Sequence, residues 1–198
     1  MRAFPLLLLA LVAGCGPLVQ IGGNDKPPAS LMTLRATATP AATQASYDRT
    51  RAVLVLVPAA TGALQTLRVP VITSNTSLAY LTGATWAEQP NKQLQHVLAD
   101  TLDAHGIVTL DPRQAPLAPG RTLTGTLMEC SLDVRDPGHV VVRVRYDAVL
   151  SINSGGPQAV RRFDATEPVP SQTPEVVAVA LNAAANRLAG DVADWVKP

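Results

Sequence analysis

The segment TLTGTLMECSLDVR-DPG-HVVVRVRYDAVLSI, residues 122–152, predicts a long β-hairpin. In its second arm, apolar positions alternate with positions that include Arg143, Arg145 and Asp147. This period of two is typical of a strand with one buried and one solvated face. Residues 136–138, Asp-Pro-Gly, supply the turn. The hairpin therefore predicts antiparallel sheet that needs cover on one face. The apolar positions are Val140, Val142, Val144, Tyr146, Ala148, Leu150 and Ile152.

A helical stretch before the hairpin predicts part of that cover. Either Thr85 and Glu88 form a capping box, or the helix begins afresh at Pro90. Gly106, after His105, indicates its C-terminal end. The apolar face comprises Leu94, Val97, Leu98, Thr101 and Leu102, and the polar side comprises Lys92, Gln95, His96 and Asp103.

A second helix is predicted at the C-terminus, with Thr173 as its cap and Pro174 at its first position. Its other side, with Asn182, Asn186 and Arg187, is polar and is expected to face water or a partner. The apolar stripe comprises Val177, Leu181, Ala184, Leu188, Val192 and Trp195.

Shorter strands complete the pattern. A nearly continuous apolar run at residues 51–57 predicts a strand covered on both faces. In residues 67–72, Pro70 implies an edge strand or a bulge. Further strands are expected at 31–34, docked on the domain edge, and at 78–81, 107–110 and 159–166, the last after a turn at 154–157. The chain is predicted to be an α+β protein, a two-layer α/β sandwich of a mixed sheet with a long hairpin and two amphipathic helices.

The N-terminus has the layout of an exported lipoprotein. Arg2 precedes an apolar core, and Leu11-Val12-Ala13-Gly14-Cys15 resembles a bacterial lipobox, in which the cysteine is acylated after cleavage before it. An ordinary signal peptide with a chance cysteine is the alternative. Gly16 is not the aspartate that typically retains lipoproteins at the inner membrane, so export to the periplasmic face of the outer membrane is expected.

This layout divides the chain into three parts. Residues 1–14 are the signal peptide, 15–46 a lipidated and mostly flexible tether, and 47–198 the periplasmic domain. Arg2 leaves with the signal, so the 16 Lys and Arg fall by one and match the 15 Asp and Glu. A neutral chain without a basic cluster argues against nucleic acid as a partner.

No catalytic, cofactor-binding or metal-binding motif is visible. With Cys15 acylated, Cys130 remains alone, and we expect a buried inert thiol that shares a strand face with Met128 and Leu132. His96, His105 and His139 lack the spacing of metal ligands, and Ser154 is not in a hydrolase elbow. Core packing is the expected role of the rare aromatics Tyr80, Trp86 and Trp195, with ligand contact as the alternative.

A set of ordered segments resembles the ABC-type transport auxiliary lipoprotein family, which accompanies MCE-type lipid transporters. The resemblance covers residues 31–197, with Leu31-Met32-Thr33-Leu34 in place of the usual aromatic near the first strand. The matching residues are Leu64 and Arg68; Leu78-Ala79-Tyr80; Trp86-Ala87-Glu88-Gln89-Pro90 with Leu94, Leu98 and Leu102; Thr122-Leu123-x-Gly125-x-Leu127; Arg162-Phe163-Asp164-Ala165; and Ala180-Leu181-Asn182-Ala183-Ala184 running to Trp195.

The resemblance implies a membrane-anchored, non-catalytic periplasmic component of an ABC lipid transport system, with the MCE-type transporter components as partners. It carries over no active-site residues and leaves direct lipid contact and a homo-oligomer open. Two other classes stay open from the residues: an outer-membrane assembly or structural lipoprotein, and a tethered hydrolase. A transporter, a barrel partner or covalent labelling by a serine- or cysteine-directed probe would distinguish the three.

Overall fold

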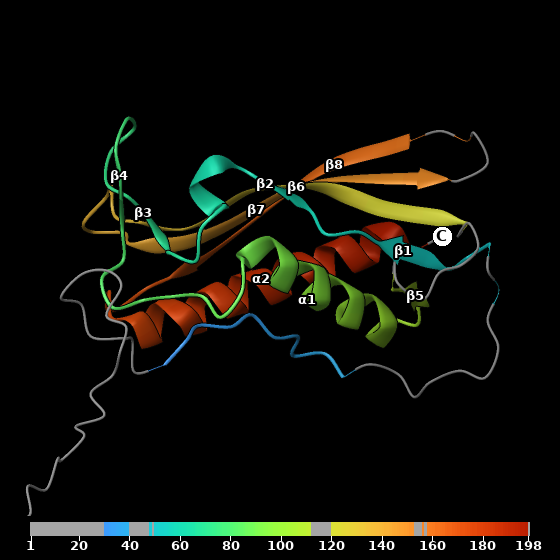
Figure 1. The fold of residues 1–198 in the computed structure, drawn as a ribbon, viewed down its shortest axis with the longest axis horizontal. Coiled ribbons are helices and arrows are strands. Elements are labelled where there is room, and N and C mark those ends of the chain that lie inside the picture. The colour runs from blue at the N-terminus through green and yellow to red at the C-terminus, as the bar shows by residue number, and fades with distance from the viewer. Residues whose placement is uncertain are drawn as a thin grey trace, which may run out of the picture.

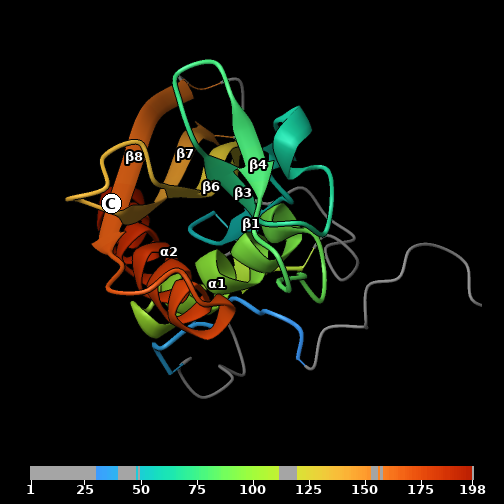
Figure 2. The same ribbon diagram turned by 90° about the vertical axis from the view of Figure 1, so that its left-hand side faces the viewer.

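The described part of the protein consists of a mixed eight-stranded sheet covered on one face by two helices (Figure 1). The computed structural model describes residues 30–39, 48, 50–111, 120–152, 156 and 158–197. Seen from one end, the helices form one layer and the strands the other (Figure 2). The predicted α+β two-layer architecture is therefore confirmed.

The predicted hairpin supplies the two longest strands of the sheet. It consists of β6 (Arg121–Asp133) and β7 (Val141–Ile152), and β8 (Gln158–Pro168) pairs antiparallel with the far side of β7. The inward face is confirmed at its centre, where Val142, Val144, Tyr146 and Ala148 are fully buried. Ile152 at the strand end is 44% exposed instead, because it lies at the open end of the hairpin.

Short strands pair one after another along the other side of β6, whose 13 residues make it long enough to hold them all. β1 (Val53–Val55), β2 (Ala59–Ala60) and β3 (Pro70–Ile72) each run parallel to β6. β5 (Thr109–Leu110) pairs with β1, and β4 (Leu78–Tyr80) pairs with β3. The short helix η1 (Gly62–Leu64) follows β2.

The expectation that Pro70 marks an edge or a bulge is wrong. β3 lies between β4 and β6, so it is an inner strand. Pro70 is tolerated there because it is the first residue of the strand, and the pairs of β3 with β6 begin only at Val71.

A bulge in β6 changes which residues face the core. The pairing with β7 shifts between Leu127 and Glu129, so Met128 turns outward and is 38% exposed. Leu127, Cys130 and Leu132 are buried. The expectation that Met128 shares the face of Cys130 is therefore wrong, because the extra residue reverses the alternation beyond it.

Helix α1 (Pro90–Ala104) begins at its proline. The capping-box alternative is wrong: Gln89 occupies the cap, and no side chain bonds the free amides there. Gly106, with φ +77°, ends the helix as expected. Every residue of the predicted apolar face is buried. Gln93, on none of the predicted faces, is also buried.

Helix α2 (Pro174–Val196) follows Thr173 as expected, although the Thr173 side chain makes no cap bond. By length and composition this helix could cross a membrane, and it is the one described helix that could. Ten of its residues are buried, and it packs on α1, β7 and β8, so it is the core helix of the domain. The predicted stripe is confirmed from Val177 to Val192, and Trp195 is partly buried.

Residues 30–39, which we call the strap, cross the helix layer on its side away from the sheet (Figures 1 and 2). Met32 and Leu34 are each 6% exposed, so the strap belongs to the core although it falls within the predicted tether. The strand expected at 31–34 reduces to a single bridge between Met32 and Trp86. The rest of the predicted tether lies outside the described residues.

Candidate functional site

Side-chain amides from both helices hold the strap. Gln93 Oε1 on α1 accepts a hydrogen bond from the Leu34 amide at 2.6 Å, and its Nε2 donates to the Glu88 carbonyl. On α2, Asn182 Oδ1 accepts from the Arg35 amide at 2.8 Å. Backbone bonds add to these, because Met32 donates to Thr85 and accepts from Ala87.

Asn186 completes this hold. Its Oδ1 accepts from the Thr37 amide at 2.7 Å, and its Nδ2 donates to the Arg35 carbonyl at 2.8 Å. We expected Asn182 and Asn186 to face water or a partner, but they face the chain's own strap. A polar pair spaced i, i+4 on an alanine-rich helix was the sequence signal for this contact.

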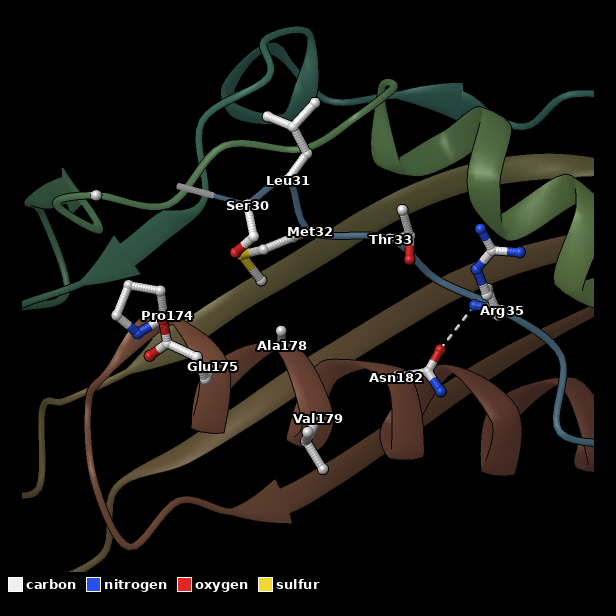
Figure 3. Close-up of a pocket in the computed structure, with 11 residues that line it drawn as sticks. Ser30, Leu31, Met32, Thr33, Arg35, Pro174, Glu175, Ala178, Val179 and Asn182 are labelled. Carbon is white, nitrogen blue, oxygen red and sulfur yellow. Dashed lines mark hydrogen bonds between the residues drawn. The ribbon is translucent and has the colours of Figure 1, made fainter. Parts of the chain in front are cut away.

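A shallow groove of about 330 Å³ runs between the strap and the first turns of α2 (Figure 3). Strap residues 30–33 and Arg35 form one wall, and Gly83 also lines the groove. Pro174, Glu175, Ala178, Val179 and Asn182 form the wall on α2. The bond between Asn182 and Arg35 closes the groove at one end (Figure 3).

Two large apolar side chains stand exposed on the walls of this groove. Leu31 on the strap is 54% exposed, and Val179 on α2 is 72% exposed. Figure 3 shows them on opposite sides of the groove, Leu31 pointing away from α2 and Val179 away from the strap. Glu175 and Arg35 add one charge of each sign, so the groove has no net charge. The two outer rims of the groove are therefore apolar, and the groove between them has no net charge that would hold an ionic ligand.

The opposite face of the molecule is the uncovered side of the sheet, and it carries paired charged side chains. Arg145 donates to Asp164 at 2.8 Å and also lies 3.8 Å from Glu129. Arg162 donates to Asp147 at 2.6 Å. These charges are paired across neighbouring strands and partly exposed, so they form a solvated surface.

The described residues that were considered for chemistry are Cys130 and the three histidines, and their surroundings differ. Cys130 is fully buried, and burial raises the pKa of its thiol to about 12. His96 and His139 are exposed on α1 and beside the hairpin turn, whereas His105 lies 3.5 Å from Asp194 at the end of α1. Among the residues that the structure describes, no three His, Cys, Asp or Glu side chains are grouped to hold a metal ion. Cys15 and Ser154 lie outside the described residues.

The rare aromatics pack within the domain. Trp86 is fully buried beside the strap, and Trp195 meets the ring of Phe163 edge-to-face, with 5.6 Å between centroids. The Arg68 guanidinium lies 4.0 Å from the centroid of the half-buried Tyr80 ring. The expected core role therefore holds for Trp86 and largely for Trp195, while Tyr80 packs under a cation at the surface.

The sequence of residues 33–193 matches the model of a protein family described as the ABC-type transport auxiliary lipoprotein component. The chain belongs to this family. The match spans both helices and all eight strands, from within the strap to the last turn of α2. The family resemblance inferred from the ordered segments is therefore confirmed. No curated protein matches the sequence.

Solved structures similar to this auxiliary lipoprotein share its fold. Protein XCC0632 from Xanthomonas campestris is 18% identical, with a TM-score of 0.72, covering 84% of this chain and 94% of the other. An uncharacterized protein is 15% identical, with a TM-score of 0.65, covering 85% of this chain and all of the other. At these identities the likeness extends to the fold alone.

Several residues of the segments that resemble the family lie where the strap meets the domain. Trp86 forms the bridge with Met32, and Ala87 donates a hydrogen bond to the Met32 carbonyl. Pro90 begins the helix that carries Gln93. Asn182 lies in the Ala-Leu-Asn-Ala-Ala segment and bonds the strap from α2. Sequence reasoning missed Gln93 and the exposed pair Leu31 and Val179, because each depends on where the strap docks.

Proposed function

We propose that this protein is the lipid-anchored auxiliary component of an MCE-type ABC system that moves lipid between the inner and outer membranes. The observation that carries the proposal is the family match over residues 33–193, behind a lipobox-like segment that ends at Cys15. On this proposal Cys15 is acylated and holds the domain at the periplasmic face of the outer membrane.

We further propose that the protein contributes binding and position, and no chemical step. Cys130 supports this, because a buried thiol with a pKa of about 12 is almost wholly protonated at neutral pH and cannot act as a thiolate nucleophile. The separation of the three histidines supports it as well. A serine- or cysteine-directed covalent probe is expected to leave the folded protein unlabelled, and specific labelling at one residue would contradict this part of the proposal.

Purification from detergent-solubilised envelopes tests the assignment to a transporter. Full-length tagged protein is expected to retain an MCE-domain protein and an ABC transporter subunit, identified by mass spectrometry against an untagged control. Crosslinking in intact cells before solubilisation checks that the contacts precede lysis. Recovery of an outer-membrane assembly barrel, with no transporter subunit in either experiment, would overturn the proposal in favour of an assembly lipoprotein.

A further inference from the structure

We propose that the groove between the strap and α2 docks on the surface of the bilayer that holds the lipid anchor, with Leu31 and Val179 inserted at the interface. This inference rests on the acylation of Cys15 proposed above and goes beyond it, because an anchor alone sets no orientation. The occupant is a lipid surface, and the docking face is the outer side of the helix layer.

The position of the strap argues for this occupant. Ser30, the first described residue, forms part of the groove wall and lies 15 residues after Cys15. Whatever its conformation, a chain of that length spans at most about 50 Å, at roughly 3.3–3.6 Å per residue. The groove is thus the part of the domain where the chain from the membrane arrives, and it stays within that reach of the bilayer.

The composition of the groove fits a lipid interface. Leu31 and Val179 are among the exposed large apolar residues of the described chain, and their side chains form the two outer rims of one groove. The groove is too shallow to enclose a whole phospholipid, but its rims can enter the boundary between headgroups and acyl chains. The charges of Glu175 and Arg35 cancel, so docking is apolar and does not require anionic lipid.

Two apolar side chains bind a bilayer weakly by themselves. The tether changes this, because it holds the groove at a high effective concentration near the surface, and a weak contact then becomes populated. Docking would keep the helix layer against the membrane and turn the uncovered face of the sheet, with its paired charges, toward the periplasm.

The chain offers a matched control position for the test. Val160 on β8 is 70% exposed, against 72% for Val179. It is an odd number of positions from the inward-facing Phe163, so it lies on the face of the sheet away from the helices. Cys130 is fully buried, so a new surface cysteine can be labelled selectively in the folded protein.

The experiment uses the full-length acylated protein, with acylation of Cys15 confirmed by mass spectrometry, in vesicles of phosphatidylethanolamine and phosphatidylglycerol. Val179→Cys and Val160→Cys each carry an environment-sensitive fluorophore, and lipids brominated in their acyl chains serve as quencher. We expect a loss of fluorescence at position 179 and none at position 160. Leu31→Glu should abolish the quenching at position 179, whereas Val160→Glu should leave it unchanged.

Equal quenching at both positions, or none at either in an acylated protein, would overturn the docking proposal. Absence of acylation at Cys15 would overturn the anchor instead, so the two failures are distinguishable. Quenching that is lost when transporter components are added, but present without them, would still support a bilayer contact of the free protein. Thermal unfolding of each variant checks that the fold is intact.

Discussion

Cys130 shows how burial decides the chemistry of a single residue. Its thiol lies among the core residues of β6 and β7 with no exposed surface, and Glu129 beside it adds to the effect of burial on the pKa. We predict that the folded protein resists alkylation at neutral pH, because reaction requires the thiolate. Mass spectrometry after iodoacetamide treatment measures this, and denatured protein, which should label fully, is the control.

The same residue has a structural role of modest size. Cys130→Ala should lower the free energy of unfolding by a cavity term on the order of 1 kcal/mol. Rapid labelling of the native protein would contradict the buried position.

Gly125 is required by a close backbone approach. Its φ is +149°, and a Cβ there would lie 2.1 Å from the Asp147 carbonyl oxygen and 2.8 Å from the Tyr146 ring. Gly125→Ala should therefore force β6 from β7 and lower the free energy of unfolding by about 3 kcal/mol. Gly190→Ala is the control, because nothing lies within 4 Å of a Cβ at that helical position. It should stabilise the protein by up to about 1 kcal/mol.

Urea unfolding of the two glycine variants measures both effects. Equal stability of Gly125→Ala and the unmodified protein would show that the two strands can separate without cost.

At the scale of elements, the strap is held by hydrogen bonds that a sequence pattern does not reveal. Asn186→Ala removes the acceptor of the Thr37 amide and the donor to the Arg35 carbonyl. We predict faster hydrogen exchange at Thr37 with the domain still folded, and a loss of about 1 kcal/mol in stability. Asp191→Ala, an exposed change on the same helix, should leave exchange at Thr37 unchanged. Unaltered protection of Thr37 in Asn186→Ala would refute the contact.

On helix α2 a buried residue, Leu188, directly follows Arg187, which forms an ion pair at the surface. Leu188 has no exposed surface, so Leu188→Asp places a charge in the core and should cost about 4 kcal/mol or more, enough to unfold the domain. Arg187 is half exposed, pairs with Glu167 and donates to the Thr166 carbonyl. Arg187→Glu should leave the fold intact, with a cost of about 1 kcal/mol for two like charges.

Circular dichroism during thermal unfolding distinguishes the two helix variants. A Leu188→Asp protein that melts like the unmodified one would mean that the stripe is a binding surface and that the core lies elsewhere.

At the scale of the whole molecule, the proposed anchor at Cys15 would decide where the domain acts. Cys15→Ser should block acylation, and fractionation should then find the protein released from the membrane or mislocalised, because the acyl chains that anchor the mature domain are missing. Arg187→Glu serves as a fractionation control that keeps Cys15. An unmodified Cys15 in the mature protein, or cleavage at another residue, would refute the anchor.

Some features of this fold depend on local pattern alone. The alternation from Val140 to Ala148 and the spacing of Leu94, Leu98 and Leu102 specify a strand and a helix with known buried faces, because side-chain direction follows the period of the backbone. Pro90, Gly106 and Pro174 mark helix ends for equally local reasons, a missing amide or a positive φ. The ordered motifs add the family, which the match over residues 33–193 confirms.

Other features arise only when distant segments meet. The bulge that turns Met128 outward depends on the register with β7, and Pro70 begins an inner strand because β4 and β6 pair with the two sides of β3. The sequence pattern predicts that Asn182 and Asn186 lie on a solvated face. In the structure the strap, some 150 residues earlier in the chain, docks on them. The exposure of Leu31 and Val179 on one groove follows from that same docking. Local periodicity determines the direction in which a side chain points. The residues that it contacts there depend on long-range packing, which no single segment encodes.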